Sequence, residues 1–180
     1  MAYFHPLLIL CLSLATQSFA HTPPPAVPCP ISLAEACKYT SYVDHCVQSL
    51  TGKPESQGAD LHGLATMSFK VAVEVGTGVA AHISQTLNTG VKDKALWQCL
   101  STCSNSFENA VEKLDVSMAG MDMKAMTDTM GWVMTVVADT EKCYGGCKDF
   151  EGEVKEQLMG MMGKFGKQCS ITLDLAQAFA

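Results

Sequence analysis

Cysteine is the residue type in this sequence with the clearest chemical consequence. The 180-residue chain contains nine cysteines, and eight remain when the first twenty residues are set aside. An even number of cysteines on an exported chain is typical of a disulfide framework. Zinc binding by two Cys-x-x-x-Cys pairs and a reactive thiol are the alternatives. The eight residues are Cys29, Cys37, Cys46, Cys99, Cys103, Cys143, Cys147 and Cys169.

The ninth cysteine, Cys11, belongs to an apolar run from Leu7 to Ala15 near the amino terminus. This run is too short to span a bilayer. It is followed by Ser18-Phe19-Ala20, which has small residues at the two positions that a signal peptidase reads. We therefore predict a secretory signal peptide over residues 1–20, although its only basic side chain is His5.

The spacing of four cysteines restricts how they pair. Cys99-x-x-x-Cys103 and Cys143-x-x-x-Cys147 each place two sulfurs one turn apart on one face of a predicted helix. In adjacent antiparallel helices, two bridges form together only as Cys99–Cys147 and Cys103–Cys143. If Cys99 bonded Cys143 instead, Cys103 and Cys147 would be separated by about 12 Å along the helices. A disulfide spans no more than roughly 7 Å between Cα atoms.

The remaining four cysteines lie nearer the ends of the chain. Cys37 and Cys46 fall on two short predicted helices, which are too short to be stable alone. A bridge between them would stabilise this pair by roughly 2–3 kcal/mol. Cys29 and Cys169 are then left, and the last long helix runs back towards the short helices, so we expect a Cys29–Cys169 bridge.

Four long segments have apolar residues at helical spacing, and none alternates with a period of two. The first begins at Asp60, a good N-cap residue. Short connections between long helices favour antiparallel neighbours. The sequence therefore predicts an all-α fold, an up-down-up-down four-helix bundle preceded by a disulfide-linked short helical hairpin. The helix breaks are predicted at Gly90, Gly120 and Gly145-Gly146.

The predicted domain organisation follows from these segments. After the signal peptide, residues 21–28 form a stiff Pro-rich leader. Residues 29–57 form the helical hairpin, and residues 58–180 form the bundle. We expect residues 29–180 to be one domain.

Composition and motifs exclude several classes of function. The net charge is −6, and the chain has twelve lysines in no basic run and no arginine, so we expect no nucleic-acid partner. Beyond the signal peptide we find no run long enough to cross a membrane, so we expect no membrane association after cleavage. No Gly-x-Ser-x-Gly elbow, Gly-rich phosphate loop or helical metal motif occurs. We therefore expect neither catalysis nor a cofactor or metal.

Several blocks of residues together carry a family resemblance. They are Cys37-Lys-Tyr-Thr-x5-Cys46, Ala59-Asp60-Leu61-x-x-Leu64-Ala65, Leu96-x-x-Cys99 with Ala110 and Leu114, Asp139-Thr140-Glu141-Lys142-Cys143, and Cys169-Ser-Ile-Thr-Leu-Asp-Leu-Ala176. In this order they resemble the plant invertase and pectin methylesterase inhibitors. The resemblance covers nearly all of residues 29–180.

This resemblance implies a four-helix bundle and a secreted inhibitor of a plant cell-wall enzyme. The expected partner is a pectin methylesterase or an invertase, whose active cleft the protein would block in the apoplast or cell wall. The family bridges its third and fourth cysteines. With Cys99 and Cys143 taken as that pair, Cys99–Cys143 is an alternative to Cys99–Cys147.

The turn between the second and third long helices is the predicted target-binding region. Some invertase inhibitors have Pro-Lys-Phe in this turn, whereas this chain has Gly120-Met-Asp-Met-Lys-Ala-Met126 and keeps only the lysine. Methionine suits an adaptable contact surface, although core packing is the competing interpretation. The candidate target-binding residues are Lys113, Asp115, Met121, Asp122, Met123 and Lys124.

A helical carrier with eight cysteines, which holds a lipid or small ligand between its helices, is the alternative function. Such carriers usually contain adjacent Cys-Cys and Cys-x-Cys. This chain has neither pattern.

Overall fold

The computed structural model describes residues 29–122, 125–147 and 149–179, so the predicted signal peptide and leader lie outside the described residues. The described residues form helices and no strand, which confirms the all-α prediction. The elements are α1 (Leu33–Cys37), α2 (Val43–Leu50), the 3-10 turn η1 (Pro54–Ser56), α3 (Leu61–Asn88), α4 (Lys94–Asp122), α5 (Met126–Cys147) and α6 (Glu153–Phe179).

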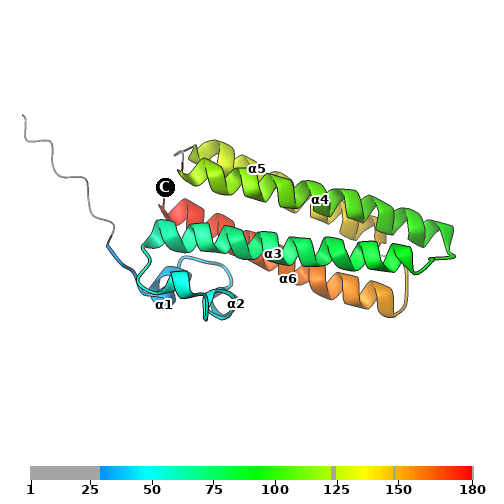
Figure 1. Cartoon of the computed structure of the whole chain (residues 1–180), viewed down its shortest axis with the longest axis horizontal. Coiled ribbons are helices and arrows are strands. Elements are labelled where there is room, and N and C mark those ends of the chain that lie inside the picture. Colours follow the sequence, from blue (N-terminus) through cyan, green and yellow to red (C-terminus); the bar gives the residue numbers. More distant parts are fainter. Residues whose placement is uncertain (1–28, 123–124, 148, 180) are drawn as a thin grey trace, which may run out of the picture.

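Helices α3 to α6 form the four-helix bundle, in which successive helices run in opposite directions (Figure 1). Helix α3 packs against α4 and α6, and α4 also packs against α5. Contact between α5 and α6 closes the ring and is the least extensive of the four. The predicted up-down-up-down topology is therefore confirmed. The α1–α2 hairpin lies against α3 and α6, at the end of the bundle where α6 finishes (Figure 1).

Side-chain caps and glycines set the ends of the long helices. Asp60 accepts a hydrogen bond from the Gly63 backbone N–H at 2.7 Å, which confirms it as the N-cap of α3. Asp93 accepts one from the Leu96 N–H at 2.8 Å and begins α4 in the same way. In the connection between these helices, Gly90 has a φ of 84°, a conformation that residues with a Cβ rarely adopt.

Two of the predicted helix breaks are wrong. Gly120 lies inside α4, and Gly145-Gly146 lie inside α5. Gly120 is buried, and a Cβ there would collide with the side chain of Thr129 on α5. Its role is therefore to let two helices approach closely, and it does not end α4. The last turn of α5 remains helical through its glycine pair because Cys147 at its end is bonded to α4.

The predicted hairpin is confirmed, together with its Cys37–Cys46 bridge, in which the Cα atoms are 5.7 Å apart. Two polar contacts attach the hairpin region to the bundle. The Ser41 backbone N–H donates to the Asp174 carboxylate of α6 at 2.7 Å. The Lys53 ammonium pairs with the Glu74 carboxylate of α3 at 2.7 Å.

Aromatic side chains and a buried polar network fill the bundle interior. Phe107 of α4 and Phe165 of α6 pack with their ring centroids 5.2 Å apart, and both are fully buried. The amide of Gln168 donates to the Ser68 carbonyl at 3.2 Å, and the Ser68 and Thr172 hydroxyls are 2.7 Å apart. These polar contacts join α3 to α6, and buried polar groups with partners help to fix one arrangement of the helices.

We expect no apolar run after the signal peptide to be long enough to cross a membrane, but one helix is an exception. Helix α3 has the length and composition to do so, with a mean hydropathy of 1.2 in its most apolar window. Half of that window is buried inside the protein. Its apolar side chains, such as Leu64 and Ile83, belong to the core, so the bundle itself accounts for the hydropathy of α3.

Gly76 on α3 gives a test of this packing. A Cβ at Gly76 would lie 2.8 Å from the Phe165 ring and 3.1 Å from a Val111 methyl. We expect Gly76→Ala to lower the free energy of unfolding by about 1–3 kcal/mol through overpacking. Gly78, two residues on, is exposed and has open space at its Cβ position. Gly78→Ala should instead raise stability by about 0.5–1 kcal/mol. Urea denaturation followed by circular dichroism measures both, and equal effects would contradict the packing described here.

Candidate functional site

Helices α4 and α5 are connected through residues 123–125 at one end and by two disulfides at the other. The bridges are Cys99–Cys147 and Cys103–Cys143, with Cα atoms 5.5 Å and 4.8 Å apart. The pairing predicted from the spacing is therefore confirmed, and the alternative Cys99–Cys143 bridge is wrong. The physical reason is the antiparallel register, which places Cys99 level with Cys147 and Cys103 level with Cys143.

The predicted Cys29–Cys169 bridge is wrong, because both thiols are free. Cys169 lies in the bundle core with none of its surface exposed, and burial raises the pKa of its thiol to about 12. Cys29 is exposed. The prediction used the direction of the last helix and neglected the face on which Cys169 lies. Its four-residue spacing from Phe165 carries the signal, since that spacing places it on the core side.

The sulfurs of the two bridges form one cluster. The Sγ atoms of Cys99, Cys103 and Cys147 all lie within 4.8 Å of one another. Three cysteine sulfurs at this spacing could in principle bind zinc. Zinc, however, binds cysteine as the thiolate, and a sulfur in a disulfide is not a thiolate. All three are bonded in disulfides, so this cluster is not assigned as a metal site.

Halfway along the two helices, an ion pair network connects α4 to α5. The Lys113 ammonium donates to one carboxylate oxygen of Asp139 at 2.7 Å, and the Lys142 ammonium donates to the other at 3.0 Å. These two hydrogen bonds, in that order, are the largest causes that lower the pKa of Asp139. The Asp139 side chain is only 20% exposed, so water screens this network less than it screens an ordinary surface pair.

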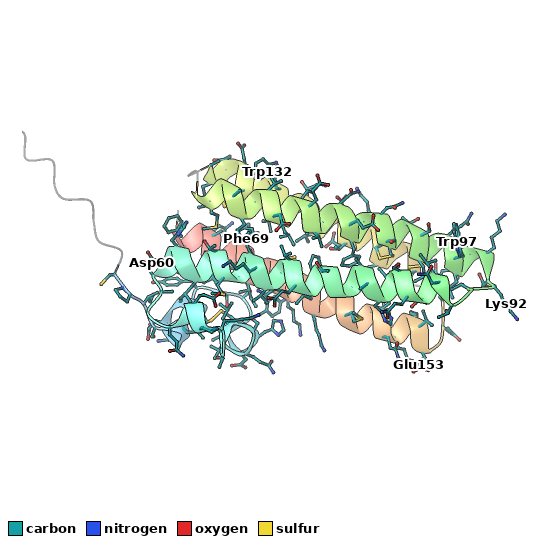
Figure 2. The ribbon with its side chains drawn as sticks, in the orientation of Figure 1. Asp60, Phe69, Lys92, Trp97, Trp132 and Glu153 are labelled. Atoms are coloured by element: carbon teal, nitrogen blue, oxygen red, sulfur yellow. A yellow bond between two sulfur atoms is a disulfide. The ribbon has the colours of Figure 1, made fainter. Side chains whose placement is uncertain are left out.

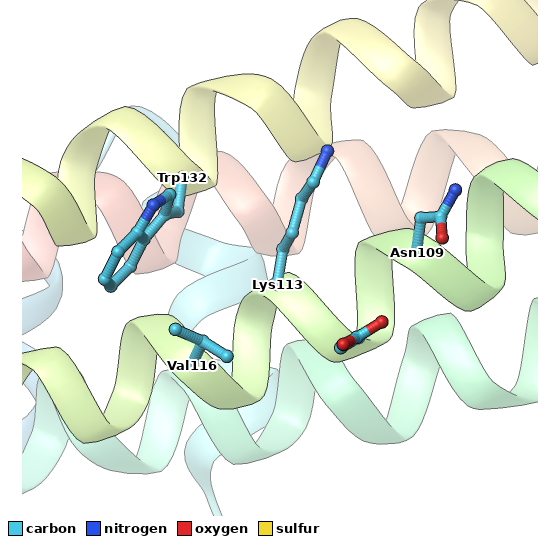
Figure 3. A pocket seen from close by; sticks show the side chains of 5 residues that line it. Asn109, Lys113, Val116 and Trp132 are labelled. Atoms are coloured by element: carbon cyan, nitrogen blue, oxygen red, sulfur yellow. The ribbon is translucent and has the colours of Figure 1, made fainter.

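A hollow with a volume of about 270 Å³ lies beside this ion pair, between α4 and α5. Trp132 of α5 forms one wall, and Val116 of α4 lies opposite (Figure 3). Lys113 extends from α4 towards α5 between Trp132 and Asn109 (Figure 3). Val116 is 47% exposed, which is unusual for an aliphatic side chain on a bundle helix. Glu112 completes the lining of the hollow.

The structure distributes the candidate target-binding residues unevenly. Lys113 lines the hollow, while Asp115 is exposed on α4 but does not line it. The Met121 side chain is 1% exposed and packs in the core, so its prediction as a contact residue is wrong. The reason is that α4 continues past Gly120, which leaves Met121 on the inner face of a helix. Asp122 is the last residue of α4, and its side chain, together with Met123 and Lys124, lies outside the described residues.

Sequence reasoning missed the two side chains that form the walls of the hollow, Trp132 and Val116. A usable signal was present. Each falls off the apolar stripe of its own helix, since the neighbouring core residues are Val133 on α5 and Leu114 on α4. A large apolar side chain away from the core stripe is a candidate contact residue.

Comparisons with known proteins point in one direction. The family described as plant invertase/pectin methylesterase inhibitor matches residues 32–175. The cell wall / vacuolar inhibitor of fructosidase 2 of Arabidopsis thaliana is 32% identical over 93 residues, which cover 52% of each protein. The chain thus spans about half the length of this relative. Pectinesterase inhibitor 11 of Arabidopsis thaliana is 24% identical over 159 residues, covering 81% of this chain and 78% of that protein.

Solved structures agree with the helical architecture. A mutant form of a pectin methylesterase inhibitor from Arabidopsis matches with a TM-score of 0.70, covering 81% of this chain and 95% of that chain. A pectin methylesterase inhibitor from Arabidopsis thaliana matches with a TM-score of 0.63. The sequence identities are 16% and 15%, so these likenesses concern the fold.

The lowered pKa of Asp139 predicts a pH-dependent contribution to stability. A carboxylate with a lowered pKa in the folded protein stabilises it above the unfolded value of about 4. This contribution is lost as the pH falls through the folded value. We expect Asp139→Asn to lower the free energy of unfolding by about 1 kcal/mol at pH 7. The difference from wild type should vanish in strong acid.

The matched control is Glu141→Gln on the same helix, where the side chain is exposed. We expect it to change stability by less than about 0.5 kcal/mol at any pH. Urea titrations at a series of pH values measure both variants. A constant effect of Asp139→Asn across the series would show that the Asp139 charge does not stabilise the α4–α5 pair.

Proposed function

Because the chain belongs to the plant invertase/pectin methylesterase inhibitor family, we propose that it is a secreted inhibitor of a plant cell-wall enzyme. It would act without catalysis, by covering the active cleft of a pectin methylesterase or an invertase in the apoplast. The relatives support both kinds of target, since one inhibits fructosidase by name and another inhibits pectinesterase by name.

The hollow between α4 and α5 is the observation that carries this proposal. Trp132 and Val116 expose apolar surface on helices that are bonded to each other, so this face needs little ordering when a partner binds. Preorganisation of this kind lowers the entropic cost of association. Tryptophan in a pocket near the centre of an interface is often a residue on which affinity depends.

Acidic side chains on α4 indicate the charge of the partner. Glu108, Glu112 and Asp115 are exposed, and their spacing of four and three residues places them on one face of the helix. The Lys113 charge beside them is paired with Asp139. We therefore infer that the target presents positive charge beside its cleft, and that salt slows association.

The alternative carrier function receives no support from the core. A carrier would hold its ligand between the helices, and that space is filled by large buried side chains such as Phe69, Phe107 and Phe165.

Titration of the oxidised protein against both enzymes at acidic pH tests the proposal. We expect stoichiometric loss of activity of a pectin methylesterase or an invertase, and the enzyme that loses activity is the target. Retention of full activity by both enzymes at protein excess would refute the inhibitor function.

Replacement of Trp132 tests whether the hollow between α4 and α5 contacts the target enzyme. We expect Trp132→Ala to raise the inhibition constant about thirtyfold, equivalent to about 2 kcal/mol of binding free energy. The matched control is Trp97→Ala, because Trp97 is 48% exposed near the other end of α4 (Figure 2). The control should leave inhibition unchanged within about twofold. A weaker effect of Trp132→Ala than of Trp97→Ala would place the target contact elsewhere.

The turn between α4 and α5 gives a second test. We propose that Asp122, Met123 and Lys124 contact the target together with Lys113 and Asp115. The double variant Met123→Glu, Lys124→Glu replaces an apolar side chain and a positive charge with two negative charges. We expect it to weaken inhibition by at least about tenfold, because the apolar contact of Met123 and the contact made by the Lys124 ammonium are both lost. Unchanged inhibition would exclude the turn from the interface.

A further inference from the structure

The two disulfides between α4 and α5 are in contact with each other. The Sγ atom of Cys103 lies 3.4 Å from the Sγ atom of Cys147, although these residues belong to different bridges. If opening of a bridge releases the thiolate of Cys103 or of Cys147, that thiolate is therefore already next to a sulfur of the other bridge. Exchange between thiols and disulfides proceeds by such an attack of a thiolate on a bonded sulfur.

A hollow with a volume of about 300 Å³ gives access to this cluster from outside. Cys99 and Cys143 line it, one from each bridge, whereas Cys103 and Cys147 do not. Gly146 also lines it and has open space where a Cβ would be. Lys142 also lines it, although its ammonium is paired with the Asp139 carboxylate. Of the two cysteines that line the hollow, Cys99 is 7% exposed and Cys143 is 1% exposed, so Cys99 is the more accessible to a small thiol.

We propose that this cluster is a thiol–disulfide exchange site for a small-molecule thiol such as glutathione. Two-electron reduction replaces the two native bridges, Cys99–Cys147 and Cys103–Cys143, with a single Cys103–Cys147 bridge, which we call the crossed bridge. It leaves Cys99 and Cys143 as thiols. The cluster would thereby respond to the thiol status of the surroundings while α4 and α5 stay covalently joined.

The first route begins at Cys143. The external thiolate attacks the Cys143 sulfur, forms a mixed disulfide with it and releases the Cys103 thiolate. Cys103 then attacks the Cys147 sulfur, which forms the crossed bridge and releases Cys99 as a thiolate that takes up a proton. A second external thiol attacks the mixed disulfide, leaves as the oxidised dimer of the reductant and frees the Cys143 thiol.

The second route begins at Cys99 and reaches the same product. Attack on the Cys99 sulfur releases the Cys147 thiolate, which attacks Cys103 and releases Cys143. In both routes two external thiols become one disulfide, and the protein gains two electrons and two protons. The routes converge because the sulfurs in contact belong to Cys103 and Cys147, the two cysteines that do not line the hollow.

The crossed bridge also requires a movement of the helices. Cys103 and Cys147 are offset by one turn, about 6 Å along the axis. A disulfide needs Cα atoms within about 7 Å. Helix α4 therefore has to slide along α5 by a fraction of a turn, so the product should be less tightly packed than the oxidised protein.

Graded reduction of the oxidised protein tests this directly. Cys29 is exposed and is first blocked with N-ethylmaleimide under native conditions. Glutathione is then added in steps, new thiols are trapped with iodoacetamide, and peptides are mapped by mass spectrometry. At the stage of two new cluster thiols, we expect label on Cys99 and Cys143 and a peptide linked through Cys103 and Cys147. Label on Cys103 with Cys143, or on Cys99 with Cys147, would overturn the proposal, because the bridges would then open independently.

A pair of double variants provides a matched control. Cys99→Ser with Cys143→Ser leaves Cys103 and Cys147, whereas Cys103→Ser with Cys147→Ser leaves Cys99 and Cys143. Each variant loses both native bridges, so the loss of stability is matched. In the same glutathione buffer, we expect about tenfold more of the bridged form in the first variant than in the second. Equal bridging, or more in the second, would overturn the proposal, whichever enzyme the protein inhibits.

Discussion

The covalent connection of α4 to α5 is the constraint on which the rest of this structure depends. The two bridges close loops with sequence separations of 48 and 40 residues, and a loop of this length contributes roughly 4 kcal/mol in the chain-entropy description. Helix α5 needs this support, because its contact with α6 is the least extensive in the ring. The buried Ser68–Gln168–Thr172 network and the phenylalanine core hold α3 and α6, while the disulfides hold α5 to α4.

Because the core and the disulfides hold the helices together, the candidate contact face lies on the outer surface of α4 and α5. The interior of the bundle is filled, so its surface is what remains for recognition. The α4–α5 face combines the partly buried Trp132 and the exposed Val116 with a network in which Asp139 neutralises Lys113. An apolar hollow with acidic side chains around it suits a partner that offers an apolar group and positive charge, and rigid helices can present it without rearrangement.

The sequence was sufficient to predict a structural feature wherever helix geometry allowed a single arrangement. Antiparallel helices with cysteines one turn apart allow one double pairing, and Asp60 before an apolar run marks a helix start; both appear in the structure. It was insufficient where tertiary contact decided the outcome. Gly120 is a residue type that often ends a helix, but here its missing Cβ lets Thr129 of α5 pack against it. Helix α4 therefore continues, and Met121 is buried. The exposed hollow also depends on two helices, so neither Trp132 nor Val116 identifies it alone.

The two ends of the α4–α5 pair are mechanically connected. Val116 belongs to α4 and Trp132 to α5, so the shape of the hollow depends on the register of one helix against the other. The same register sets which sulfurs are level in the disulfide cluster. A slide of α4 that permits a crossed bridge would therefore carry Val116 past Trp132 and strain the hydrogen bond between Lys113 and Asp139. Because packed helices resist small continuous shifts, register is the property through which chemistry at one end of this pair reaches the surface at the other.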